Sequence, residues 1–164
     1  MRAVKGMSLV ECLVALLVLT IGLMGMARLI IEGLRNGHLA LLRTQAVNLV
    51  NDMSERIRAN PEARSAYECA SYTGGPTEQG CAPTDSASGT SCSPAQLAED
   101  DLARWQSAAR TALPMVSADS CAANVVYTEP AASNEPAQYR VSVSWNEPGE
   151  LTPLVHQSDL LVSP

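Results

Sequence analysis

The sequence predicts an α+β protein in which a long N-terminal helix packs as a spine on a small antiparallel β-sheet head, with one extra short helix. The first half of the long helix is predicted to be transmembrane and the second half amphipathic. Three features lead to this prediction. An apolar run lies near the N-terminus, an apolar repeat of three and four residues follows it as far as Pro61, and a repeat of two begins after Cys121. Apolar residues that recur about every 3.6 residues indicate a helix, and apolar residues at every second position indicate strands with one covered face.

Composition limits the chain to one small globular head. Of its 164 residues, the apolar run leaves only about 130 for a soluble core. The chain has no Phe, so the core must be built mainly from Leu, Val, Ala and Met. The net charge is −6 and the basic residues are scattered, with Lys5 as the one lysine, which argues against a phosphate-binding surface. We therefore expect no nucleic-acid partner.

The apolar run has the length and flanks of a membrane segment. Arg2 and Lys5 precede it, and basic residues before an apolar run keep that end in the cytoplasm. No charged residue lies between Cys12 and Ala27, and with the four residues before Glu11 the run can cross a hydrocarbon core of roughly 30 Å. The prediction is a single membrane pass with the remainder of the chain outside the cytoplasm.

Glu11 is the exception within this run. An ionised side chain there costs on the order of 2–3 kcal/mol unless it lies near the interface or finds a partner. One interpretation places Glu11 at the headgroup level with no function, and the other gives it a functional partner. A different reading of the whole run is an ordinary signal peptide cut after Gly25-Met26-Ala27, which would release a soluble protein that begins at Arg28.

The helix continues beyond the membrane segment as an amphipathic helix. Its apolar side chains recur at steps of three and four residues: Leu39, Leu42, Ala46, Leu49, Met53 and Ile57. Asn60-Pro61 ends it, because proline disfavours helix at the residue before it. This stripe is the surface that we expect to pack on the head.

Four cysteines outside the apolar run predict two disulfides. They are Cys69, Cys81, Cys92 and Cys121, whereas Cys12 lies in the apolar run. An even number behind an export-like N-terminus is typical of a protein in an oxidising compartment such as the periplasm. The spacings lack the close pairs of a zinc site. Three pairings are possible, and the sequence does not choose among them.

The rest of the head is predicted as a stapled loop, a helix and three strands. Residues 62–93 are rich in Ser, Thr, Gly, Pro and Ala and show little periodicity. Ser93-Pro94-Ala95-Gln96 has the pattern of a helix start with a capping box, and Pro114 ends this helix. Alternation around Val125, over 139–145 and over 154–162 indicates three strands.

No pattern of residues indicates catalysis. The chain has no glycine-rich phosphate loop, nucleophile elbow, HExxH or CxxC pattern. His38 and His156 are isolated in the sequence, so we interpret each as a solvated or packing residue. We expect no enzymatic activity, no cofactor and no metal.

The N-terminus resembles the class III leader of type IV pilins and of type II secretion pseudopilins. The resemblance rests on the string Lys5-Gly6-Met7-Ser8-Leu9-Val10-Glu11 directly before the apolar run. It implies a pilin-like fold, cleavage by prepilin peptidase between Gly6 and Met7, and N-methylation of Met7, which stands where the family usually has Phe. It also implies that Glu11, fifth in the mature chain, pairs with the N-terminal amine of an adjacent subunit during assembly.

A narrower resemblance is to the PilV (pilus modification protein) family of minor pilins. It rests on the strings at 21–27, 43–46 and 51–61: IGLMGMA, RTQA and NDMSERIRANP. It implies a minor pilin that helps to prime pilus assembly within a complex at the pilus tip. The implied partners are other minor pilins, the major pilin, a tip adhesin, prepilin peptidase and, before assembly, inner-membrane lipid.

These resemblances imply a division of the chain and a location. Residues 1–6 would be the leader, 7–29 the transmembrane and filament-core half of the helix, and 30–164 the periplasmic head with the amphipathic half. The protein would lie in the bacterial inner membrane, with one pass and a periplasmic head, and then in the pilus tip at the cell surface. A minor pseudopilin of type II secretion (I type) and a secreted disulfide-bonded soluble protein remain as alternatives.

Overall fold

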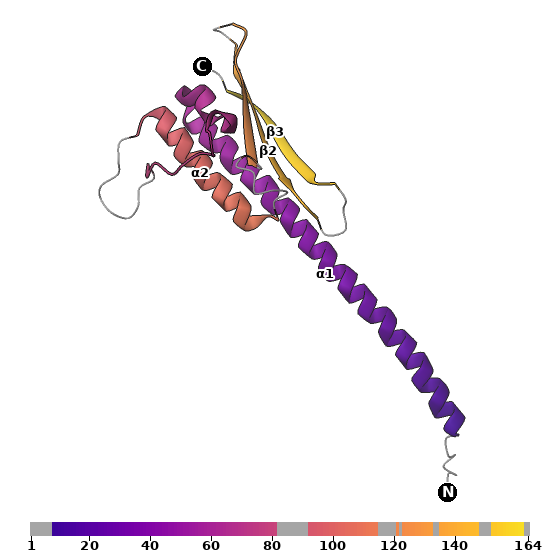
Figure 1. Ribbon diagram of the computed structural model, residues 1–164. Coiled ribbons are helices and arrows are strands. Elements are labelled where there is room, and N and C mark those ends of the chain that lie inside the picture. Colours follow the sequence, from indigo (N-terminus) through magenta and orange to yellow (C-terminus); the bar gives the residue numbers. More distant parts are fainter. Residues whose placement is uncertain are drawn as a thin grey trace. The chain divides into compact units, whose positions relative to one another are not determined.

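The computed structural model describes residues 8–81, 92–114, 121, 123–132, 135–147 and 152–162. The α+β prediction is confirmed (Figure 1). The elements in chain order are α1 (Leu9–Ala59), η1 (Pro61–Tyr67), η2 (Cys69–Ser71), α2 (Pro94–Ala112), β1 (Ala123–Thr128), β2 (Ala137–Trp145) and β3 (Leu154–Val162). The chain divides into two compact units, Met1–Leu41 and Leu42–Pro164, which we call the N-terminal unit and the head.

The N-terminal unit is helical from Leu9 onward. Every side chain from Ser8 to His38 is exposed, including large apolar ones such as Met24, at 80%. By length and composition α1 can cross a membrane, with a mean hydropathy of 2.4 in its most apolar window. A surface of this kind is stable only against lipid or against other apolar helices.

The remainder of α1 supplies one wall of the head core. The predicted stripe is largely confirmed, since Leu42, Ala46, Met53 and Ile57 are buried, and Val50 joins them. Leu39 and Leu49 are only half-buried. The buried residues recur at the three- and four-residue steps that keep side chains on one helix face.

Helix α2 begins and ends as its sequence predicts. The hydroxyl of Ser93 accepts from the backbone N–H of Gln96 at 3.3 Å, and the Gln96 side chain accepts from the N–H of Ser93 at 3.0 Å. This capping box satisfies two N–H groups that a helix start otherwise leaves unpaired. Trp105 on α2 is buried and donates its indole N–H to the Leu49 carbonyl at 2.8 Å, so it joins α2 to α1.

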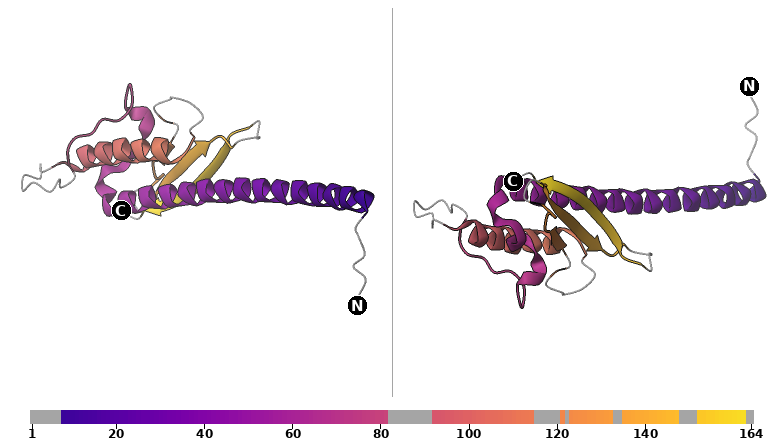
Figure 2. Two further views of the ribbon diagram at one scale, coloured as in Figure 1. Left: turned by 90° about the horizontal axis from the view of Figure 1, so that it is seen from below. Right: turned by 90° about the horizontal axis from the view of Figure 1, so that it is seen from above.

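The sheet is antiparallel, with strand order β1-β2-β3. Val141 on the central strand pairs with Val125 of β1 and with Ser158 of β3. Figure 2 shows α2 and the sheet from two sides. One core joins α1, α2 and the sheet, and its strand residues include Val125, Tyr139, Val141, Val143, Trp145 and Leu160.

The segment after α1 is more ordered than the sequence indicates. It was predicted as a loop, but it forms the 3₁₀ helices η1 and η2, and Ala63, Tyr67 and Cys69 in them are buried. The prediction missed these helices because 3₁₀ turns are short and three buried residues give no clear period. Tertiary contacts rather than local pattern therefore hold this segment on the core.

Candidate functional site

The predicted assembly site lies at the start of α1. Glu11 is exposed in the first helical turn, and its backbone N–H bonds to the Ser8 carbonyl at 3.0 Å. A carboxylate in this position is favoured by the positive end of the helix dipole. Gly6 and Met7, the predicted cleavage and methylation positions, lie outside the described residues. Cys12, the free cysteine next to Glu11, is also exposed.

Two disulfides join the described cysteines of the head, as predicted. Cys69 pairs with Cys121, and Cys81 pairs with Cys92. The first bond ties η2 to the segment just before β1, across 52 residues of sequence, and the second closes a short loop before α2. The structure thereby selects one of the three pairings that the sequence left open.

Asp100 on α2 holds the segment before Cys81. Its carboxylate accepts from the backbone N–H groups of Gln79 (2.7 Å) and Gly80 (2.9 Å) and from the Arg104 side chain (2.8 Å). Only 1% of the Asp100 side chain is exposed. Burial alone would raise its pKa, but the Arg104 bond and the two backbone bonds outweigh burial and place the pKa below its ordinary value.

A second carboxylate on α2 joins three elements. Asp101 accepts from Arg56 of α1 at 2.8 Å and from the Tyr67 hydroxyl at 3.0 Å. The same hydroxyl, which has one hydrogen to share between the two acceptors, also lies 3.2 Å from the Arg56 carbonyl oxygen. Burial is the main reason that the pKa of the Tyr67 phenol lies well above its ordinary value. No local sequence pattern indicates these contacts, since the partners of Asp101 lie 45 and 34 positions away along the chain.

Glu147, just after β2, forms an ion pair with Arg43 of α1. Its carboxylate accepts two bonds from Arg43, both at 3.0 Å, and 2% of its side chain is exposed against 61% for Arg43. The Arg43 bonds lower the pKa of Glu147. Sequence reasoning missed this pair, because its members lie 104 positions apart in the sequence.

The head should lose stability in acid, because the pKa of Asp100 is lower in the folded state than in the unfolded state. The unfolded carboxyl has a pKa of about 4. Its contribution to stability is therefore complete above about pH 4 and is lost as the pH falls through the lower folded pKa. Thermal unfolding followed by tryptophan fluorescence at pH 7, 4 and 3 should show a melting temperature that falls mainly between pH 4 and pH 3.

Asp100→Asn should melt lower than wild type at pH 7, because an amide has one acceptor oxygen and cannot accept from Arg104 at one side and from Gln79 and Gly80 at the other. It should lose less on acidification, because residue 100 no longer ionises. Asp159→Asn is the matched control. Its ion pair with Arg140 also lowers the pKa of Asp159, but the pair is exposed and contributes little. Equal acid sensitivity in wild type and Asp100→Asn would contradict this account.

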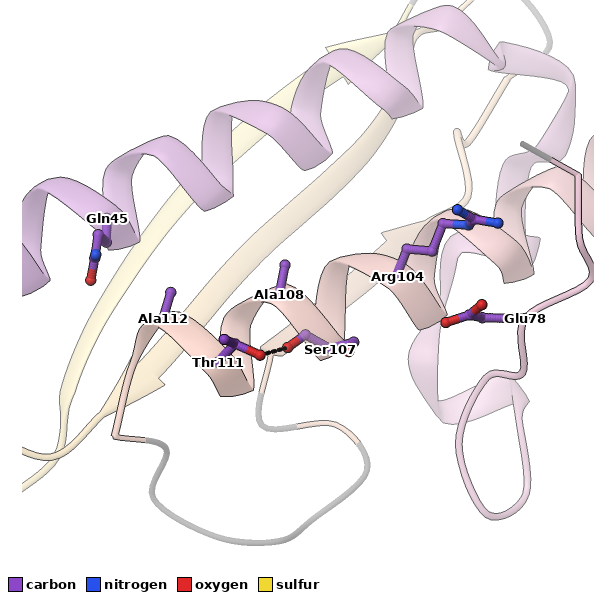
Figure 3. A pocket seen from close by; sticks show the side chains of 7 residues that line it. All are labelled: Gln45, Glu78, Arg104, Ser107, Ala108, Thr111 and Ala112. Carbon is purple, nitrogen blue, oxygen red and sulfur yellow. Dashed lines mark hydrogen bonds between the residues drawn. The ribbon is translucent and has the colours of Figure 1, made fainter. Parts of the chain in front are cut away.

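An open depression of about 630 Å³ lies over α2 in the described part of the head. Figure 3 shows Gln45 of α1 at one end and Arg104 and Glu78 at the other. Between them Thr111 donates its hydroxyl hydrogen to the Ser107 carbonyl at 2.9 Å. These residues do not form a nucleophile with a base. Among the described residues, no group of three His, Cys, Asp or Glu side chains could hold a metal ion.

Comparison with known proteins gives two matches. A family model described as type IV pilin, Tt1218-like, matches residues 30–103, and the prokaryotic N-terminal methylation motif matches residues 1–27. No curated protein and no solved structure matches the chain. The pilin family is structural rather than enzymatic, and the methylation motif with the apolar helix indicates inner-membrane anchoring followed by pilus assembly.

The pilin match covers the second part of α1, η1, η2 and the start of α2, and the methylation motif covers the segment that contains Gly6, Met7 and Glu11. A pilin with this N-terminus has other pilins as partners and is processed by prepilin peptidase. The two matches and the α+β fold with its long apolar helix together support the identification of this chain as a type IV pilin with an N-terminal methylation motif.

Proposed function

We propose that the chain is a minor pilin of the PilV kind, which helps to prime pilus assembly as part of a minor pilin complex at the pilus tip. The observation that carries the proposal is an exposed apolar helix with one carboxylate, Glu11, near its start, joined to a compact head with two disulfides. A filament subunit needs both parts. No catalytic role is proposed.

In this proposal residues 1–6 are removed and Met7 becomes the methylated N-terminus. Residues 7–29 lie in the inner membrane and later in the filament core, while residues 30–164 form the periplasmic head. The charge on Glu11 pairs with the N-terminal amine of an adjacent subunit, since a charge in an apolar surrounding is tolerable when it is matched. The neighbours are other minor pilins, the major pilin and a tip adhesin.

A deletion strain tests the pilus role against a role in type II secretion. Loss of the chain should reduce surface pili, measured by shearing and immunoblotting for the major pilin, and leave secretion of type II substrates unchanged. Re-expression of the wild-type chain should restore piliation. Normal piliation together with lost secretion would reject the minor pilin and favour a minor pseudopilin.

A further inference from the structure

The sheet of the head has one covered edge and one open edge. β1 is the end strand on one side, and η1, η2 and α2 all contact it. β3 is the end strand on the other side and pairs with β2 alone among the described elements (Figure 1). A nine-residue edge strand presents a row of backbone N–H and C=O groups that another extended chain can pair with.

We propose that the open edge of β3 is an interaction surface that takes up an extended, uncharged and alternately apolar segment of a neighbouring pilin-like subunit as a fourth strand. The neighbour in this statement rests on the proposed function. The open edge itself rests on the sheet alone. Pairing of this kind obtains its affinity from main-chain hydrogen bonds and its specificity from alternate side chains.

Of the features by which edge strands usually avoid pairing, β3 has one charged side chain, Asp159, which already pairs with Arg140. Lysine, proline and bulges are the common protections. The strand Leu154–Val162 contains neither lysine nor proline, and its register with β2 runs without a bulge from Trp145↔Leu154 to Ala137↔Val162. Two large apolar side chains on its outer face, Val155 and Leu161, are 59% and 65% exposed. The edge is therefore regular, long and apolar near both ends.

The charges on and beside β3 favour an uncharged segment. Apart from His156, Asp159 is the one acidic or basic residue in the strand, and Arg140 of β2 already pairs with it at 2.8 Å. A charged side chain brought alongside Val155 or Leu161 would lose hydration without gaining an opposite charge, which costs free energy. An uncharged side chain in either place avoids this cost.

The inner face explains why the side chains of the segment that face the core should be apolar. Val143 and Trp145 of β2 are buried, but their cross-strand neighbours on β3, His156 and Leu154, are only half-buried. At these positions the inner face of β3 is therefore less buried than that of β2. Apolar side chains of an added strand would extend the core at this edge, so every second residue of the segment should be apolar.

A second copy of this chain is a poorer occupant. Two β3 edges paired antiparallel are related by a two-fold axis along the sheet normal. Because α1 packs on the sheet, that axis would point the Leu42 ends of the two heads in opposite directions. Pairing β3 with β1 of another copy is opposed by the elements that cover β1.

Site-specific photocrosslinking in piliated cells tests the proposal. In a Cys12→Ser background, Gln157→Cys in the full chain would carry a maleimide–benzophenone probe beside the edge. Val126→Cys, at an exposed position on the covered β1 side, is the matched control. We expect an adduct with one pilin-like protein from Gln157→Cys and at least tenfold less from Val126→Cys. Mapped adducts from Val155→Cys and Gln157→Cys should lie two residues apart on the neighbour.

Charge at the edge provides a second measurement. Val155→Lys with Leu161→Lys should reduce the adduct at least tenfold, whereas Val126→Lys should leave it unchanged. No adduct from Gln157→Cys while the chain is present in sheared pili would overturn the edge proposal and leave the proposed function standing. An adduct with a second copy would overturn the choice of occupant. An adduct with a protein unrelated to pilins, with the chain absent from sheared pili, would overturn both the pilin neighbour and the proposed function.

Discussion

Glu11→Val is expected to be processed normally but to be lost from filaments. The substitution removes the one carboxylate from the start of the exposed apolar helix and leaves the head untouched. In the proposed filament core, the N-terminal amine of an adjacent subunit would then be buried without an opposite charge. Stranding one member of a buried pair costs about 3–5 kcal/mol. This cost corresponds to roughly a 100-fold or greater loss of incorporation.

The measurement is the ratio of this chain to major pilin in sheared pili, with the mature mass determined in parallel. Glu32→Val is the matched control, because Glu32 lies on the same exposed helix and has no proposed pairing role. Glu11→Asp, which keeps the charge, should retain part of the incorporation. Wild-type levels of Glu11→Val in sheared pili would refute the pairing role.

Loss of the Cys69–Cys121 disulfide should destabilise the head more than loss of the Cys81–Cys92 disulfide. The two bonds close loops with sequence separations of 52 and 11 residues. On the chain-entropy account these closures contribute about 4 and about 3 kcal/mol. Cys69 is also fully buried, and Gln106 donates to its sulfur, so its replacement disturbs packing as well.

Urea unfolding of the detergent-solubilised full chain, followed by tryptophan fluorescence, gives this comparison. Both tryptophans, Trp105 and Trp145, are buried in the head, so the signal reports head unfolding. Cys69→Ser with Cys121→Ser should lower the midpoint further than Cys81→Ser with Cys92→Ser. The shorter-loop variant therefore serves as the matched control. A larger effect from that variant would contradict the prediction that Cys69–Cys121 is the disulfide that stabilises the head more.

The regular elements were predictable because local pattern determines them. The capping box at Ser93, the break at Asn60-Pro61 and the alternation over 139–145 each act within a few residues, and each is found in the structure. The predicted number of disulfides was also correct. Their pairing was not predictable, because it depends on which loops the folded core brings together.

The polar contacts that hold the head together were missed for a related reason. Asp100 reaches residues 79 and 80, Asp101 reaches Arg56, and Glu147 reaches Arg43. No local sequence signal marks any of these contacts. For the assembly site, the roles of Gly6, Met7 and Glu11 are what the resemblance of residues 5–11 to the class III leader implies. These three assignments remain predictions that depend on other proteins.

The mass of the mature N-terminus in sheared pili tests the central claim most directly. If the chain is a pilin subunit, peptide mass analysis of that fraction should find it beginning at N-methylated Met7, with residues 1–6 absent. A chain that begins at Arg28 and is found in the soluble periplasmic or secreted fraction instead would contradict the account, because an ordinary signal peptide would then have been removed together with Glu11.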